Sequence, residues 1–440
     1  MRTAQRSTRA STLVMKVFVS LYLMMCTSVI ADSGKSSLNE SSIQESAPHQ
    51  FNGPVITVKQ AIQSALEKSR KLQSLNTNVR MAEYLVKSSG KLRNPEVRLS
   101  DVNAGQIGDR IDEYELGVRW RFPEPGELGE DRQQAVVRLW DRKVDQLRFQ
   151  QQLIARVRRS YADVLKSDYL AELAHQRILK EDERIRLIEH MVDLGTRSIV
   201  YYTKAKMWHA ESKNDYTRAI EKQGMERRQL AQRSGIPENA SLVETELPEV
   251  TQELDELIAL AISNRPETAL VEQRITLAHR RRNYERYQLL PRPTFIEFSR
   301  HYEKKDWNNW NEWKIGIELP LFDWNIGNIQ ATDLAVRKKE EEYNAIQESI
   351  ADEVRVAYVV YRDLLLDWKN FKQNADDLIF NAGKVVEEAK EHEVLLPDEV
   401  MEMELTIIET KKLLSEKRRD LAHALIDLYY AIGVDGHEQL

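Results

Sequence analysis

Cysteine is nearly absent from this sequence of 440 residues, which contains one, Cys26. Disulfide frameworks and thiolate zinc sites need several cysteines, so both are excluded. A glycine-rich phosphate loop, a His-Glu-x-x-His pair and a Gly-x-Ser-x-Gly elbow are also missing. The nine histidines are scattered, and His209, His301 and His392 have no partners at ligand spacing. The sequence therefore predicts neither an enzyme nor a bound cofactor or metal.

Long apolar runs are scarce too, and Val17–Ile30 is the sustained one. At about 1.5 Å per residue it is too short to span a ~30 Å hydrocarbon core comfortably. Basic residues precede it and Ala31 follows it, which is typical of a signal peptide cleaved before Asp32. A lipoprotein signal with Cys26 as the lipidated residue is the alternative, although Met25 is bulky where a small residue is expected.

The charge balance is acidic. The formal net charge of -6 becomes -10 without the predicted signal peptide, 1–31, which carries four basic and no acidic side chains. An acidic exported chain is a poor binder of nucleic acid, so no such partner is expected. Residues 32–52 are rich in Ser, Gln, Glu and Asn and predict a flexible leader.

An internal repeat organises the rest of the chain. Val58–Leu66 and Leu254–Ile262 share a helical pattern at a spacing of about 196 residues. After each come a second helical stretch, a break marked by proline, two alternating segments and a very long helical stretch. We interpret the chain as one duplicated unit, with repeats at 53–247 and 248–434 and a tail at 435–440.

Proline is missing from two long intervals, Pro125 to Pro237 and Pro320 to Pro397. Because proline inside a helix costs ~3 kcal/mol or more, these intervals can hold unbroken helices. A helix over Asp131–Leu194 would be about 95 Å long, several times the ordinary length. Its apolar positions recur at helical spacing and predict coiled-coil packing: Leu147, Leu153, Ile154, Val157, Tyr161, Val164, Leu165 and Tyr169.

Two segments between the helices alternate apolar and polar residues, Tyr114–Phe122 and Trp313–Leu319. Glu96–Asn103 and Thr294–Tyr302 are the predicted partners, so each repeat offers a β-hairpin. The predicted turns contain Gly105, Gly108, Asp109, Lys304, Lys305, Asp306 and Asn308. The second face of the strands carries Arg119, Arg121, Glu297, Lys314 and Glu318. Aromatic residues gather near the strand ends: Trp120, Phe122, Trp307, Trp310, Trp313, Phe322 and Trp324.

These strands admit two interpretations. A small soluble sheet packed on helices is the common case. Apolar-out, polar-in strands with aromatic girdles are what a water-filled membrane barrel requires. Four strands cannot close a barrel and lipid tolerates no open sheet edge, so several chains would have to associate. Two chains give eight strands, whose interior side chains nearly fill, whereas three give twelve and leave a lumen.

Tandem repeats of helix, hairpin and long helix after a signal peptide resemble the TolC-like outer-membrane efflux proteins, over roughly Val55–Gly433. The resemblance implies a mainly α fold with membrane β-strands. Three chains would form a homotrimer with a twelve-stranded outer-membrane β-barrel, continued by an α-helical barrel in the periplasm of a Gram-negative-type cell. It also implies a passive exit duct that receives its cargo from an inner-membrane pump through a periplasmic adaptor (membrane fusion) protein.

Two motifs resemble the heavy-metal cation branch of that family, the cobalt-zinc-cadmium type: Asn94–Leu99 and Leu319–Ile329. This resemblance implies heavy-metal cargo and a proton-driven pump. The sequence departs from the branch at Trp324, where a basic residue is usual, and at Phe122–Gly129, where a Gly-Gly-Lys-type turn is common. A duct for drugs or secreted proteins is the alternative. So is a non-channel envelope coiled coil or an adaptor, although an adaptor has one helical hairpin flanked by β domains.

The resemblance extends to the tips of the helical hairpins, which dock the adaptor and constrict the pore in the family. The matching tip residues are Gly195, Thr196, Arg197 and Ser198 in the first repeat and Leu396, Pro397 and Asp398 in the second. In well-known members two aspartates three residues apart follow the tip. Tyr201 and Lys204 stand at those positions in the first repeat, and Glu399 and Glu402 in the second.

A spacing of three residues puts Glu399 and Glu402 on one helix face, and three chains would gather six carboxylates near the axis. Such a ring admits cations and repels anions. Lys204 would neutralise part of that charge. The alternative is that both glutamates are ordinary solvated acids, favourable near a helix N-terminus.

Overall fold

The computed structural model describes residues 52–101, 113–303, 309–392 and 397–435. These residues form long helices, a four-stranded sheet and one pair of two-residue strands. The predicted signal peptide, nearly all of the predicted leader, the two predicted turns of the β-hairpins and Leu396 lie outside the described residues, as do Trp307 and positions 436–440 of the predicted tail. Among the described helices, none combines the length and the apolar character needed to cross a membrane.

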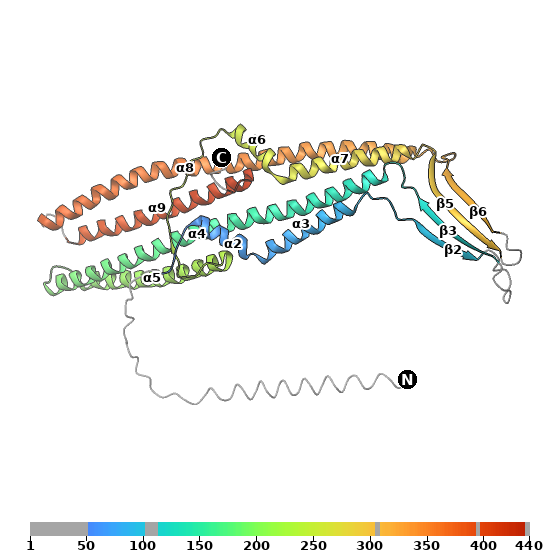
Figure 1. Cartoon of the computed structure of the whole chain (residues 1–440). Helices are drawn as coiled ribbons and strands as arrows, with labels where there is room; N and C mark the ends of the chain where they lie inside the picture. The colour runs from blue at the N-terminus through green and yellow to red at the C-terminus, as the bar shows by residue number, and fades with distance from the viewer. Residues whose placement is uncertain (1–51, 102–112, 304–308, 393–396, 436–440) are drawn as a thin grey trace, which may run out of the picture. The chain divides into compact units, whose positions relative to one another are not determined.

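The same succession of elements occurs twice along the chain (Figure 1). The first set is α2 (Val58–Lys68), α3 (Arg70–Ser88), β2 (Glu96–Asp101), β3 (Glu113–Arg121), α4 (Glu127–Asp193) and α5 (Ile199–Ser234). The second set is α6 (Leu254–Asn264), α7 (Pro266–Tyr287), β5 (Arg292–Glu303), β6 (Asn309–Glu318), α8 (Ile326–His392) and α9 (Pro397–Ile432). The long helices agree in length: α4 and α8 have 67 residues each, and α5 and α9 have 36 each.

Local sequence signals set the helix ends. Thr57 and Gln60 form a capping box at the start of α2, in which each side chain bonds the other's backbone N–H. Pro266 opens α7, where its missing N–H costs nothing. The helices α4 and α5, with the short turn between them, fill most of the proline-free interval. The last residue of α5, Ser234, is followed by Gly235, whose φ of 71° favours glycine.

Each half of the chain has its own apolar core around a buried tyrosine. The Tyr161 hydroxyl on α4 accepts a hydrogen bond from the Val243 backbone N–H at 2.9 Å, beside the parallel pair β1 (Val55–Ile56) and β4 (Ser241–Leu242). The Tyr361 hydroxyl on α8 accepts from the Val250 N–H at 3.1 Å. The first core contains Ala61, Ala65, Leu153, Val157, Val164, Leu230 and Ile236, and the second contains Leu257, Ala261, Val354, Leu425, Leu428 and Ile432.

The apolar stripe predicted on α4 is buried in its middle. Leu153, Ile154, Val157, Tyr161 and Val164 are buried, which agrees with the predicted packing. Its two ends differ from the prediction, because Leu147 is 36% exposed and Tyr169 is 43% exposed. The described part of the single chain therefore covers these ends of the stripe only in part.

The sheet has the order β2-β3-β5-β6, and all its neighbouring strands are antiparallel. The two predicted hairpins are present, and the pairing of β3 with β5 joins them edge to edge. A β-bulge lies at Pro293–Phe295, and Gly316 sits opposite it. A Cβ atom on Gly316 would meet the Phe295 ring and the Thr294 hydroxyl, so a larger residue there would force both side chains to shift.

Candidate functional site

The apolar face of the sheet is exposed. Val97, Val118, Phe298 and Trp313 lie in register across its four strands, and the outer two are 75% and 67% exposed. Leu99, Leu116, Ile315 and Ile317 add to the same face and are exposed as well. A soluble sheet hides such a face against a core, because each large apolar side chain gains about 1.5–3 kcal/mol on burial.

The polar face of the sheet is buried at its centre, on strand β5. Three rows of residues in register cross this face, and each row has one residue from β2, β3, β5 and β6 in that order. The rows are Ser100, Glu115, His301 and Trp310; then Arg98, Gly117, Ser299 and Glu312; and then Glu96, Arg119, Glu297 and Lys314. Glu297 is 3% exposed, Ser299 0% and His301 9%. At the centre of the sheet, polar side chains are thus buried while apolar side chains are exposed, the reverse of the pattern in a soluble protein.

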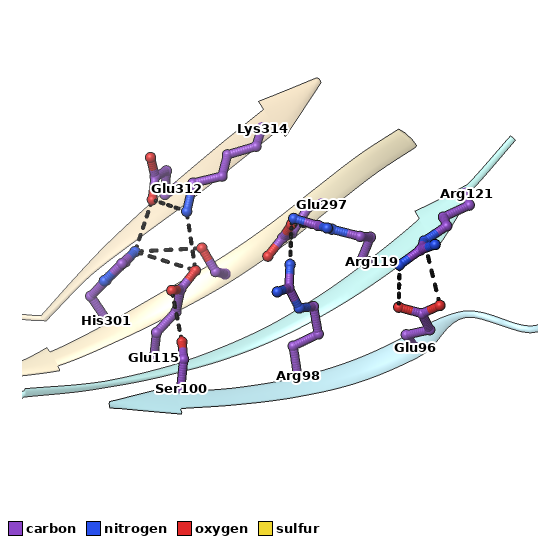
Figure 2. Close-up of polar contacts among 11 residues, drawn as sticks. Glu96, Arg98, Ser100, Glu115, Arg119, Arg121, Glu297, His301, Glu312 and Lys314 are labelled. Carbon is purple, nitrogen blue, oxygen red and sulfur yellow. Dashed lines mark hydrogen bonds and ion pairs between the residues drawn. The ribbon is translucent and has the colours of Figure 1, made fainter. Parts of the chain in front are cut away.

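Ion pairs compensate the buried charge of Glu297. Arg119 on the neighbouring strand donates to its carboxylate, and Arg98 lies 3.5 Å away on the next strand (Figure 2). The Arg119 guanidinium also lies over the Phe295 ring, 4.4 Å from its centroid. At the sheet's edge, Arg121 pairs with Glu96 at 3.5 Å.

A second cluster on this face centres on His301. Its Nε2 atom lies 2.9 Å from a Glu312 carboxylate oxygen and 3.8 Å from a Glu115 oxygen. Lys314 donates to Glu115 at 3.2 Å and lies 3.0 Å from Glu312, while Ser100 donates to Glu115 at 3.1 Å (Figure 2). Together, Glu115, His301 and Glu312 bring three potential ligand atoms within 4.8 Å of one another.

The His301 cluster departs from the sequence prediction, which gave His301 no partners. Spacing along the chain could not find them, because Glu115 and Glu312 reach His301 from two other strands. Trp310 also differs from its predicted place in an aromatic girdle. It lies in register with His301 and stacks on the imidazole with ring centroids 4.7 Å apart, so it belongs to the polar face.

A charged residue, Arg300 on β5, interrupts the predicted apolar face. Arg300 is in register with Leu116 and Asn311, on the apolar side. Its guanidinium lies 5.4 Å from the centroid of the Tyr302 ring, which stacks on Tyr114. The aliphatic stem can follow the apolar face while the charged end reaches toward the end of the strand.

The segment Leu319–Ile329 forms the turn between β6 and α8 and the first residues of α8. Asn325 has a φ of 49°, which asparagine tolerates better than most residues, and its backbone N–H bonds the Asp323 side chain at 2.8 Å. The Asn325 amide donates to the Glu285 backbone oxygen at 3.0 Å and accepts from Asn328 at 2.7 Å. These motif residues therefore fix the start of α8 against α7.

The first helical tip is a tight turn at Gly195–Ser198. Gly195 has a φ of 70°, and its N–H bonds the Val192 carbonyl at 3.0 Å. The Thr196 backbone N–H and hydroxyl both donate to the Met191 carbonyl, at 2.9 and 2.8 Å. Ser198 precedes α5, and its carbonyl accepts from the Tyr201 N–H at 3.0 Å.

Asp398, in the first turn of α9, connects the two tips within one chain. The Tyr201 hydroxyl on α5 donates a hydrogen bond to its carboxylate. Arg184 on α4 lies 3.4 Å from the same carboxylate, and Arg197, in the turn between α4 and α5, lies 3.7 Å from it. Burial, and then the bond to Asp398, raise the pKa of Tyr201. The Arg184 guanidinium also stacks over Trp208 at 4.6 Å. We call Arg184, Arg197, Tyr201, Trp208 and Asp398 the tip network.

The predicted constriction residues lie close to the tips in the sequence of α5 and α9. Glu399 and Glu402 on α9 and Lys204 on α5 are exposed. Sequence reasoning placed Tyr201 at a constriction position but missed its contact with Asp398, because the contact joins residues 197 positions apart. Pro397 is the first residue of α9. Proline is tolerated there because the first backbone N–H groups of a helix have no partner within the helix.

No family model matches the chain, and neither does the sequence of any curated protein. Solved structures do match it. CusC, a protein that forms a transmembrane channel, is 15% identical, with 91% of this chain and 100% of CusC covered and a TM-score of 0.64. The outer membrane protein VceC of Vibrio cholerae is 14% identical, with 86% and 96% covered and a TM-score of 0.65. The MtrE outer membrane channel of Neisseria gonorrhoeae is 17% identical, with 86% and 89% covered and a TM-score of 0.63. The chain has the fold of outer-membrane channel proteins.

Proposed function

We propose that this chain is the outer-membrane component of a tripartite efflux system, a passive exit duct rather than an enzyme. The sheet carries the proposal, because an exposed apolar face backed by a polar face whose central residues are buried suits lipid outside and water inside. A passive duct needs no catalytic site. Its driving force would come from an inner-membrane pump, which delivers cargo through a periplasmic adaptor protein.

A homotrimer completes the proposed pore. The outer strands of the sheet, β2 and β6, are antiparallel to each other by the sheet order, so β6 of one copy can pair with β2 of the next. Three copies supply twelve strands, enough for an outer-membrane barrel with a lumen. The long helices would continue this barrel into the periplasm as a helical duct.

Exposed apolar residues on α8 support association along the helices too. Val356, Val359 and Val360 follow the helical spacing of three and four residues, and each is about half exposed or more in the single chain. Such a stripe is costly in water and is typical of a surface covered by another subunit. A neighbouring copy would cover it in the trimer.

The tips at Gly195–Ser198 and Leu396–Asp398 are the proposed docking points for the adaptor. Glu399 and Glu402 are the proposed cation-selecting ring, with Lys204 opposing part of their charge. The tip network would hold the two hairpins of a chain together, since Asp398 bonds Tyr201 and pairs with Arg184 across the helices. Opening the tips would therefore require breaking a partly buried charge contact.

Heavy-metal cations are the proposed cargo, supported by the Leu319–Ile329 motif and by the acidic residues behind the tips. The pump would then be proton-driven. A duct for drugs or secreted proteins is the second candidate, because the motif residues Asp323, Asn325 and Asn328 have a structural task in the turn before α8. Cleavage of residues 1–31 as a signal peptide and the division into repeats at 53–247 and 248–434 belong to the same proposal.

The mass of the protein from detergent-extracted outer membranes tests the channel proposal. Light scattering corrected for bound detergent should give about three chains, and the purified complex should form discrete conductance steps in planar bilayers. A water-soluble monomer that yields no conductance would overturn both the membrane sheet and the duct. Metal sensitivity of a deletion strain, compared with drug sensitivity, then separates the two cargo candidates.

A further inference from the structure

We infer that Glu115, His301 and Glu312 form a binding site for one divalent transition-metal ion of the Zn²⁺ class, with Lys314 as a built-in competitor for the ion. A passive duct needs no such site, so the inference goes beyond the proposed function. It does not rest on that function either, because every ligand comes from a single chain.

The spacing of the ligand atoms fits a metal ion. Zinc binds nitrogen and oxygen ligands at about 2.0–2.2 Å, so two neighbouring ligands of a tetrahedral ion are about 3.3–3.5 Å apart. The His301 Nε2 atom lies 2.9 Å from Glu312 and 3.8 Å from Glu115, which brackets that value. Small side-chain adjustments would bring all three atoms around one ion.

The donor set selects the class of metal. One imidazole with two carboxylates suits Zn²⁺, Co²⁺, Ni²⁺, Fe²⁺ or Mn²⁺. It disfavours Cu⁺, which prefers sulfur ligands, and it disfavours Ca²⁺ and Mg²⁺, which prefer oxygen ligands alone. Three protein ligands would leave a fourth position for water or for a passing anion.

The sheet holds the three ligands in place before any ion arrives. Glu115, His301 and Glu312 stand on β3, β5 and β6, whose ladders fix their separation. Trp310 stacks on the His301 ring with an angle of 2° between the planes, and Ser100 donates to Glu115. Outer contacts of this kind orient metal ligands and raise affinity.

The Lys314 ammonium group occupies the position between the carboxylates that a metal cation would take. Its ammonium group bridges both carboxylates, at 3.2 and 3.0 Å (Figure 2). The Lys314 side chain is 38% exposed, so it has room to turn away when a metal ion takes its position. A purely structural ion cluster is the competing explanation. Replacing Lys314 distinguishes the two, because a structural cluster would lose a partner, whereas a metal site would lose a competitor.

The experiment uses the full chain purified in detergent, titrated with Co²⁺ and then with Zn²⁺. Visible absorption by Co²⁺ reports ligand number and type, and Zn²⁺ displacement gives the affinity. The variants are His301→Ala, which removes the nitrogen ligand, and Lys314→Met, which keeps the length of the side chain and removes its charge. The matched control is His209→Ala, which removes a histidine paired with Asp182 outside the sheet.

The expected result is one ion per chain, with affinity lowered at least about tenfold by His301→Ala and raised at least about tenfold by Lys314→Met. His209→Ala should match the unmodified protein. Gain of affinity in Lys314→Met cannot arise from misfolding, which protects the test from a variant that merely unfolds. Equal binding by the unmodified protein and both sheet variants would overturn the site. Metal binding is measured without a conducting pore. A protein that binds no metal would therefore not contradict the proposed duct, and a protein that conducts no ions would not contradict the metal site.

Discussion

Glu181 on α4 is an acid in a setting that disfavours its charge. The residue is 2% exposed, and one of its carboxylate oxygens accepts no hydrogen bond from the described part of the chain. Arg184 is 4.0 Å away, a distance that offsets the lost hydration only in part. Burial therefore raises the pKa of Glu181 above its ordinary value of 4.5.

A raised pKa in the folded state makes the protein less stable as the pH rises. Folding favours the protonated acid, so its contribution to stability is fully present below the unfolded pKa and is lost as pH rises through the folded pKa. Glu181→Gln, which is neutral at every pH, should raise the free energy of unfolding at pH 7 by on the order of 1 kcal/mol. The advantage should vanish below about pH 4.5, near the ordinary glutamate pKa.

Thermal unfolding in detergent, followed by circular dichroism at several pH values, measures this difference. Glu211→Gln on α5 is the control, because Glu211 is exposed and its replacement should leave the pH profile unchanged. A Glu181→Gln protein with an unaltered profile would mean that Arg184 already compensates the buried charge.

Glu399 and Glu402 carry the prediction about ion selectivity. Replacing both with glutamine should lower the preference for cations over anions, since three chains would lose six negative charges at the tips. The reversal potential of the channel across a salt gradient measures this preference. Glu409→Gln with Glu416→Gln removes the same charge farther along α9. Equal reversal potentials for the two double variants would contradict the prediction and indicate that Glu399 and Glu402 are ordinary solvated acids at a helix start.

The sequence did not reveal which distant side chains contact the functional residues. His301 and Asp398 were both visible in the sequence, one as an isolated histidine and the other as a tip residue. Their contacts, with Glu115 and with Tyr201, join positions far apart in the chain. Residue type and local spacing contain no information on such pairs without the strand register and the packing of the helices.

At the scale of elements, the apolar face of the sheet makes the sharpest prediction. Ile315→Lys puts a charge on an apolar face position that is 64% exposed. In lipid this costs about 2–4 kcal/mol near the bilayer midplane, so the protein should be lost from the outer-membrane fraction. A small sheet in water would accept the same lysine at little cost.

Membrane fractionation followed by immunoblotting measures the effect of Ile315→Lys. Met207→Lys is the control, because Met207 on α5 is similarly exposed in the single chain, at 68%, but lies outside the sheet. Normal levels of both variants in the outer membrane would count against lipid as the neighbour of this face.

Most elements could be predicted from the sequence, and the reason is physical. Period-two alternation indicated the strands, and the absence of proline indicated the long helices, because both are properties of neighbouring residues. The pairing of β3 with β5 is not local, so the sequence did not predict that the two hairpins form one sheet. The bulge at Pro293–Phe295 was missed for the same reason, since it depends on the facing Gly316.

For the whole molecule, the stripe on α8 predicts how copies associate. Val356→Glu places a charge among Val359 and Val360, where a neighbouring copy would have to bury it. The mass in detergent should shift from about three chains toward one. Asn344→Glu, on an exposed part of the same helix, adds the same charge away from the stripe and should leave the trimer intact. An unchanged mass for Val356→Glu would move the interface to another face.

The pairing of β3 with β5 also determines the order in which the chain can fold. Contacts within the hairpins join residues only 15 and 11 positions apart, whereas Arg119 and Glu297 are 178 apart. The entropy lost on closing a loop grows with its length, so the hairpins should form early and the four-stranded sheet late. The broad apolar surface would then be assembled at the end of folding, and a newly made chain would present two narrow, separate hairpins to water in the meantime.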